Sequence, residues 1–104
     1  MSSDNVVMLD NTVSLKGEIT FYNAPAICAQ LLSMLPTDQP IIVNLQQVAK
    51  CDSASIVVLL QIIRFVNQHQ QTVQFVDMPK PMRVLSELYD LNPIFKLKNQ
   101  SNDK

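Results

Sequence analysis

Apolar and polar residues alternate with a period of two in two parts of the chain. The first is Thr12–Lys16, which together with the apolar run Val6–Leu9 before Asp10-Asn11 predicts a hairpin of two short strands. The same alternation in Thr72–Val76 predicts a later strand. Ile41–Leu45 is instead a continuous run rich in β-branched residues, which is typical of a strand buried on both faces. We therefore expect a small sheet with Ile41–Leu45 at its centre.

Three other segments have the length or the apolar spacing of helices. The first follows Asn23, a favourable N-cap residue, and ends before Pro36. The second runs from Ala54 to about Gln68, and the third spans Met82–Tyr89. Strands and helices therefore alternate along most of the chain, which predicts an α/β fold.

The expected architecture is a small mixed β-sheet of four or five strands with about three helices packed mainly on one face. A fifth strand would be Ile94–Leu97, a short edge strand that follows Pro93. Gly17, the only glycine, follows the second strand and is expected to adopt a backbone conformation that other residues avoid. We expect residues 1–97 to form one domain and the polar residues 98–104 to form a disordered tail.

Composition narrows the classes of function. The 104 residues are 47% hydrophobic and carry a formal net charge of −1, which gives no overall electrostatic attraction to nucleic acid or anionic lipid. The longest apolar run, Ile56–Leu60, is far shorter than the ~20 residues of a membrane span. The first ten residues lack the features of a secretion signal, and Cys28 and Cys51 lack metal-ligand spacing. We therefore expect a cytoplasmic protein without a metal or cofactor.

The sequence contains no acid–base pair or nucleophile at a recognisable motif spacing. Glu18 is expected to make a loop hydrogen bond, and His69 follows the second helix among glutamines, where a solvated histidine is typical. A single glycine cannot build a glycine-rich phosphate loop. We therefore expect a non-catalytic protein, with any nucleotide hydrolysis supplied by another subunit.

Two motifs give this chain a resemblance to STAS domains. Leu15–Thr20 is similar to the Leu-x-Gly-Glu-(Leu/Ile)-(Asp/Thr) opening of that family. Ile41–Leu45, Val48 and Cys51–Ser55 resemble the family's buried strand and the Asp-(Ser/Thr)-x-(Gly/Ser) loop that enters a helix. The resemblance covers roughly Val6 to Leu97, and it implies a STAS-like fold that works by binding a protein partner.

Two branches of this family differ at one position. In the anti-sigma factor antagonists, which phosphorylation controls, the switch residue is the second hydroxyl of Asp-Ser-(Ser/Thr)-Gly. The matching residue here, Ala54, has no oxygen to phosphorylate. The STAS subunit of the Mla-type phospholipid ABC transporter places Ser or Thr directly after the Asp, as Ser53 does, and often contains a Leu-Tyr-x-Leu segment like Leu88–Leu91.

The resemblance therefore favours an accessory subunit that binds the cytoplasmic ATPase of a phospholipid ABC transporter and so contributes to outer-membrane lipid asymmetry. Its partner would hold it at the inner face of the inner membrane. The alternative is a signalling module of the anti-sigma factor antagonist type, regulated by serine phosphorylation.

The second predicted helix carries the expected binding surface. At 100° per residue, Ser53, Val57 and Arg64 fall on one face together with Gln61 and Gln68. Val57 would then be the apolar centre of a small docking surface with a polar rim. Alternatively, it is one isolated exposed residue without a role. The expected partner-binding residues are Asp52, Ser53, Ala54, Val57, Gln61 and Arg64.

The start of this helix allows three roles for its polar residues. Asp52 or Ser53 is expected to cap the helix by accepting a backbone N–H. The unpaired donors and partial positive charge of a helix N-terminus also suit an acidic side chain of a partner. Ser53 and Ser55 are candidate phosphorylation sites, where nearly two added negative charges would block a docked surface.

Overall fold

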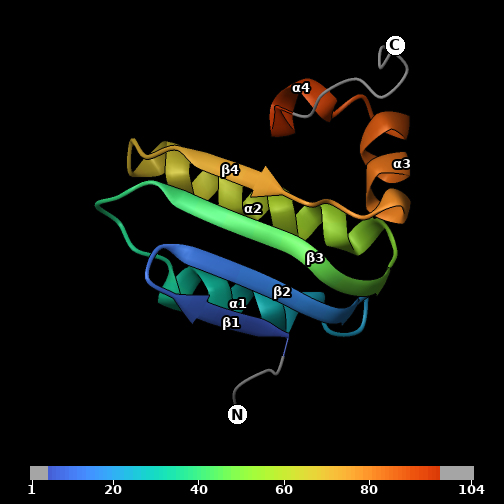
Figure 1. Cartoon of the computed structure of the whole chain (residues 1–104), viewed down its shortest axis with the longest axis horizontal. Helices are drawn as coiled ribbons and strands as arrows, with labels where there is room; N and C mark the ends of the chain where they lie inside the picture. Colours follow the sequence, from blue (N-terminus) through green and yellow to red (C-terminus); the bar gives the residue numbers. More distant parts are fainter. Residues whose placement is uncertain (1–4, 97–104) are drawn as a thin grey trace.

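A computed structural model of the chain describes residues 5–96, which form one four-stranded sheet and four helices (Figure 1). In chain order the elements are β1 (Val6–Leu9), β2 (Thr12–Ile19), α1 (Ala24–Met34), β3 (Ile41–Cys51), α2 (Ser53–Gln68), β4 (Val73–Val76), α3 (Lys80–Leu88) and α4 (Asn92–Phe95). The α/β fold class, the mixed sheet and the order of its first seven elements are as predicted. Within the described residues, no helix is both long and apolar enough to span a membrane.

The strand order follows the chain order, β1-β2-β3-β4. The predicted hairpin is confirmed, with β1 antiparallel to β2 and Leu9 opposite Thr12 across the turn. β2, β3 and β4 run parallel, because α1 and α2 each carry the chain back to the start of the next strand. Both crossovers step in the same direction across the sheet, so right-handed connections place both helices on the same face.

The core lies between the sheet and helices α1 and α2, which cover one of its faces (Figure 1). The inward side chains of β2 and β3 are completely or almost completely buried, and they pack with side chains of both helices. These core residues include Val13, Leu15, Ile41, Val43 and Leu45 from the strands and Ile27, Leu31, Leu59 and Ile62 from the helices. Helices α3 and α4 follow β4 and lie past its carboxyl end, where α3 contacts α2 (Figure 1). The prediction that the helices cover one face of the sheet therefore holds for α1 and α2.

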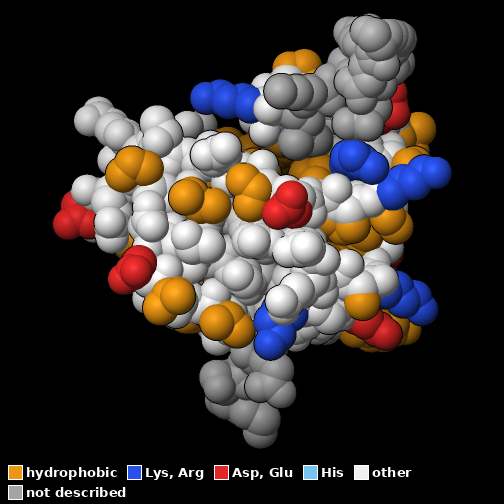
Figure 2. Space-filling model, in the orientation of Figure 1, with side chains coloured by type: hydrophobic (Ala, Val, Ile, Leu, Met, Phe, Trp, Pro, Cys, Tyr) orange, Lys and Arg blue, Asp and Glu red, His pale blue; other side chains and the backbone are white. Residues whose placement is uncertain are grey.

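The prediction that Ile41–Leu45 is buried on both faces was wrong. Ile42 and Asn44 are only partly buried, because their side chains point to the face that no described helix covers. A strand needs apolar residues on both sides only when helices cover both faces. Here the two crossover helices lie on one side, and the open face of the sheet presents mostly uncharged polar and scattered apolar side chains (Figure 2).

The predicted strand at Ile94–Leu97 was also wrong. Asn92–Phe95 form the short helix α4. Pro93 suits its first turn, because proline has no N–H and the N–H groups of a first turn have no partner within the helix. The Ser86 hydroxyl donates to Asn92 Oδ1 at 2.7 Å, and the buried Phe95 ring packs edge-to-face on Phe75 at 5.3 Å. These tertiary contacts favour a helical turn over strand pairing. Leu97 and the tail predicted over 98–104 lie outside the described residues.

Gly17 has the special backbone that the sequence predicts, but it lies inside β2 and does not follow it, because β2 continues to Ile19. The φ of Gly17 is +75°, and the pairing of β2 with β3 shifts register between Gly17 and Glu18. The Asn5 side chain bridges this irregularity by donating to the carbonyl oxygens of Lys16 and Glu18, at 2.7 and 3.0 Å. A Cβ at position 17 would lie 3.4 Å from that amide nitrogen.

We predict that Gly17→Ala destabilises the fold by about 1–2 kcal/mol, because a Cβ disfavours a positive φ. Gly17→Asn should lose less, since asparagine tolerates this region better than alanine. Urea denaturation of the three proteins measures the difference in the free energy of unfolding. An alanine variant as stable as the wild type would show that position 17 does not need this conformation.

Candidate functional site

The start of α2 is organised by the carboxylate of Asp52. Asp52 Oδ1 accepts a hydrogen bond from the Ala54 N–H at 2.9 Å and caps the helix. Asp52 Oδ2 accepts from the Phe21 N–H at 3.1 Å, so the same side chain also holds the loop between β2 and α1. Of the two predicted capping residues, Asp52 is therefore the one that caps. Its carboxylate fixes two segments that lie 31 residues apart in sequence.

The two candidate phosphorylation sites differ in accessibility. Ser53 is exposed at the first position of α2. Ser55 is completely buried, and its hydroxyl donates to the Asp52 carbonyl oxygen at 2.8 Å. This burial and hydrogen bond give Ser55 a structural role at the helix start, and a kinase would reach its hydroxyl only if that start opened, so its phosphorylation stays an untested prediction. Ser53 stays a candidate.

The face of α2 that the helical spacing singled out does point to solvent. Ser53 and Arg64 are exposed, Ala54 and Gln61 are partly buried, and 51% of Val57 is accessible. Val57 lies one turn from Ser53, as a helix requires. The structure thus brings the predicted binding residues to one accessible surface. That they bind a partner stays a prediction.

The sequence interpretation missed an aromatic pair beside this face. Phe21 and Tyr22, in the loop before α1, are 76% and 93% exposed, and their rings contact each other edge-to-face at 6.1 Å. Together with the starts of both helices they line a hollow of about 620 Å³, which we call the aromatic groove. The aromatic groove consists of Phe21, Tyr22, Ala24, Pro25, Cys28, Ala54, Val57 and Gln61. None of these side chains is charged, so Val57 belongs to an apolar surface and is not isolated.

The loop that carries the aromatic pair is held by side-chain hydrogen bonds. Asn23 Oδ1 accepts from the Thr20 N–H at 2.8 Å, and Asn23 Nδ2 donates to the Glu18 carbonyl oxygen at 2.8 Å. Asn23 occupies the N-cap position of α1, yet its side chain makes no capping bond there, contrary to its predicted capping role. It stabilises the loop instead. The signal in the sequence was two adjacent aromatic residues between a bulge glycine and a helix start.

The two cysteines border the site without being reactive groups. Burial raises the pKa of the Cys28 thiol in the aromatic groove. Burial also raises the pKa of the Cys51 thiol; a hydrogen bond with Ser55 opposes the shift, and the nearby charge of Asp52 adds to it. Both thiols are therefore protonated at neutral pH, which disfavours nucleophilic or metal-binding roles.

Other polar residues do not assemble a catalytic centre with this surface. His69 lies at the far end of α2, where its ring packs on Phe65 at 4.3 Å and Nδ1 lies 2.9 Å from the Phe65 carbonyl oxygen. Glu18 contributes its carbonyl oxygen to the loop bonds described above. Over residues 5–96, no group of three His, Cys, Asp or Glu side chains is placed to hold a metal ion.

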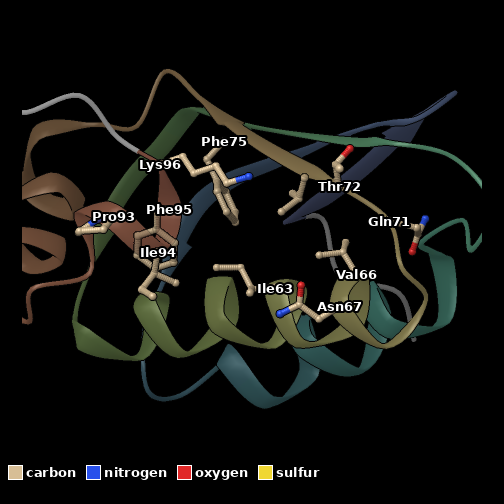
Figure 3. Close-up of a pocket in the computed structure, with 11 residues that line it drawn as sticks. Ile63, Val66, Asn67, Gln71, Thr72, Phe75, Pro93, Ile94, Phe95 and Lys96 are labelled. Carbon is tan, nitrogen blue, oxygen red and sulfur yellow. The ribbon is translucent and has the colours of Figure 1, made fainter.

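A second cleft lies away from the start of α2, between α2, β4 and α4 (Figure 3). It has a volume of about 310 Å³, and its apolar side chains include Ile63, Phe75, Ile94 and Phe95. Among the described residues that line it, Lys96 is the only charged one. None of the predicted site residues lies there.

The comparison with family models now identifies the domain. Residues 6–97 match the family model described as "Mlab, STAS domain". The chain belongs to the STAS domain family. STAS domains are generally non-catalytic regulatory modules that mediate protein–protein interactions, which agrees with an exposed apolar groove that lacks an acid–base pair. Among curated proteins, none matches the sequence significantly.

Solved structures show the same fold. The unphosphorylated anti-sigma factor antagonist SpoIIAA is similar, with a TM-score of 0.69 and 15% identity over 92% of this chain and 88% of that one. An anti-sigma factor antagonist from Mycobacterium paratuberculosis has a TM-score of 0.62 and 20% identity over 99% of this chain and 94% of that one. At these identities the likeness establishes the STAS fold.

We predict that Asp52→Ala lowers the free energy of unfolding by about 1–2 kcal/mol, because it removes the cap of α2 and the bond to the Phe21 N–H. Asp52→Asn keeps one acceptor oxygen and should lose less. Chemical denaturation measures both. Asp38→Ala, in the exposed loop before β3, is the matched control and should change stability by less than about 0.5 kcal/mol. Equal losses in the Asp38 and Asp52 alanine variants would contradict this role.

Proposed function

We propose that this STAS domain is a non-catalytic accessory subunit that binds the cytoplasmic ATPase of a phospholipid ABC transporter. The transporter would maintain the lipid asymmetry of the outer membrane. The observation that carries the proposal is the exposed start of α2, where Val57 lies in the aromatic groove beside Phe21 and Tyr22. Ser53 directly after Asp52, and Ala54 in place of a switch hydroxyl, support the transporter branch of the family. The description of the matching family model supports the same branch.

The aromatic groove has the composition of a protein-binding surface. Exposed aromatic rings contribute much of the binding energy at interfaces because they bury a large area and lose little side-chain entropy. Tyr22 and Phe21 supply these rings, and Val57 and Pro25 extend the apolar area. Since none of the described residues that line the groove is charged, a partner's apolar side chain could enter it without removing one of their charges from water.

The groove is also held in place before a partner arrives. The Asp52 carboxylate fixes the Phe21 backbone to the start of α2, and Asn23 fixes the same loop to the end of β2. A surface that is already ordered loses less conformational entropy on binding. This favours a stable docking role over a surface that must fold on contact.

Binding alone is enough for a regulatory effect. If the subunit binds one conformation or assembly state of the ATPase more tightly, it shifts the population toward that state by its differential affinity. It supplies no catalytic residue. The ATPase would hold it on the cytoplasmic side of the inner membrane.

A serine-regulated signalling module is the second candidate, and the fold it shares with anti-sigma factor antagonists is the observation behind it. Ser53 is the only one of the two candidate serines that is exposed. Intact-mass analysis of the protein purified from cells separates the two functions. The transporter proposal expects the unmodified mass. Persistent phosphate on Ser53, together with capture of a kinase-like anti-sigma factor, would instead support the signalling function and contradict the transporter proposal.

We predict that Val57→Asp or Tyr22→Ser weakens binding to the ATPase by about 30-fold or more, which is the usual effect of losing a residue that dominates an interface. Co-purification from a Gram-negative host followed by titration of the purified ATPase measures this. Leu32→Asp is the matched control, because Leu32 is a similarly exposed apolar residue at the other end of α1. It should bind like the wild type.

Two results would count against the proposal. If the wild-type chain recovers no transporter ATPase from such a host, the ATPase is not its partner. If the Val57→Asp variant binds the ATPase with unchanged affinity, the aromatic groove is not the docking surface.

A further inference from the structure

Helix α3 exposes apolar side chains that the fold does not use. Its buried residues are Met82 and Ser86, whereas Val84 and Leu88 are 51% and 69% exposed. Val84 and Leu88 are four residues apart, so they lie on the same side of the helix. A nine-residue helix that buries one apolar side and exposes another is typical of a contact surface.

This exposed side of α3 meets the start of α2 in a cleft of about 560 Å³, which we call the α3 cleft. Its lining residues are Cys51, Asp52, Ser53, Lys80, Pro81, Val84 and Leu85. Asp52 and Ser53 line the α3 cleft, and the next residue, Ala54, lines the aromatic groove. The two hollows therefore flank the same helix start, one toward α1 and the other toward α3.

The two charged residues of the α3 cleft differ, because Asp52 already has hydrogen-bond partners and the Lys80 side chain has none among the described residues. Both oxygens of the Asp52 carboxylate already accept backbone N–H bonds, from Phe21 and Ala54. Lys80 is exposed, and its side chain makes no ion pair or hydrogen bond with any of residues 5–96. Figure 2 shows basic side chains beside apolar ones over α3. The acidic residue of α3, Glu87, is seven residues and about 10 Å along the helix axis from Lys80.

We propose that the docking surface continues across the start of α2 into the α3 cleft, and that the protein bound there presents an apolar side chain next to a carboxylate. The apolar group would pack on Val84 in the cleft, with the exposed Leu88 one turn further along α3, and the carboxylate would pair with Lys80. This inference rests on the proposed function and adds the chemistry of the partner's contact. A partner that straddles the helix start uses both hollows, which makes recognition more selective than either contact alone.

A protein fits these features better than a lipid surface does. The lining of the α3 cleft holds one lysine beside the carboxylate of Asp52 and adjoins the proposed docking surface, whereas a bilayer surface binds apolar faces that carry many cations. The chain's formal net charge of −1, with Glu87 and Asp90 close to the exposed Leu88, opposes attraction to anionic lipid.

The test uses the purified full-length chain and the purified ATPase that co-purifies with it. We expect Lys80→Glu to weaken binding about tenfold and to reduce the dependence of affinity on salt, because it replaces an attractive charge pair with a repulsive one. A Val84→Ser and Leu88→Ser double variant should also weaken binding about tenfold. The matched controls are Lys16→Glu, on the open face of the sheet, and Leu32→Ser, on α1; both should bind like the wild type.

The outcomes separate this inference from the proposed function. If Val57→Asp abolishes binding while Lys80→Glu and the double variant bind like the wild type, the α3 cleft is not part of the interface and only the inference is overturned. If the wild type does not bind the ATPase, both are overturned. Binding of the wild type to phosphatidylglycerol vesicles that Lys80→Glu abolishes would replace the protein partner with a lipid surface. Should the double variant lose its far-UV circular dichroism spectrum, Lys80→Glu alone decides.

Discussion

One carboxylate holds the candidate site together. Asp52 accepts an N–H from the start of α2 with one oxygen and an N–H from the loop before α1 with the other. Through these two bonds it orients the first turn of α2 and positions Phe21 beside it. The aromatic groove and the accessible Ser53 both depend on that arrangement. A side chain with a single acceptor could cap the helix, but it could not also fix the loop.

The topology of the sheet decides where this carboxylate can act. Because β2, β3 and β4 are parallel and in chain order, two crossovers of the same hand place α1 and α2 side by side on one face. Both helices then begin at the end of the sheet where the parallel strands finish, which is where α/β proteins place their binding sites. A surface made from two helix starts and their preceding loops follows, and it lacks a catalytic acid–base pair. Its chemistry suits docking.

Much of this STAS domain follows from local patterns in the sequence. The hairpin, the later strands and the helices α1, α2 and α3 lie where the sequence predicts them, because period-two alternation and helical spacing are local properties of the chain. β2 and β3 continue to Ile19 and Cys51, past the predicted ends at Lys16 and Leu45, because they pair with each other beyond the local pattern. The exposed face of α2 was predicted for the same reason, since helix geometry alone places Val57 one turn after Ser53. The unusual backbone at Gly17 was predicted from a residue type that has no Cβ.

Other features were decided only by tertiary contacts. The burial of Ser55 depends on the hydrogen bond of its hydroxyl to the Asp52 carbonyl oxygen and on the packing of α2, which periodicity did not predict. Phe95 joins a helical turn because Phe75 offers it a buried contact, although the short apolar segment after Pro93 was predicted as an edge strand. The sequence by itself determined the elements and the accessible face of α2. The tertiary structure decided which loop lies beside that face, because a carboxylate finds its second partner only when segments distant in sequence have packed together.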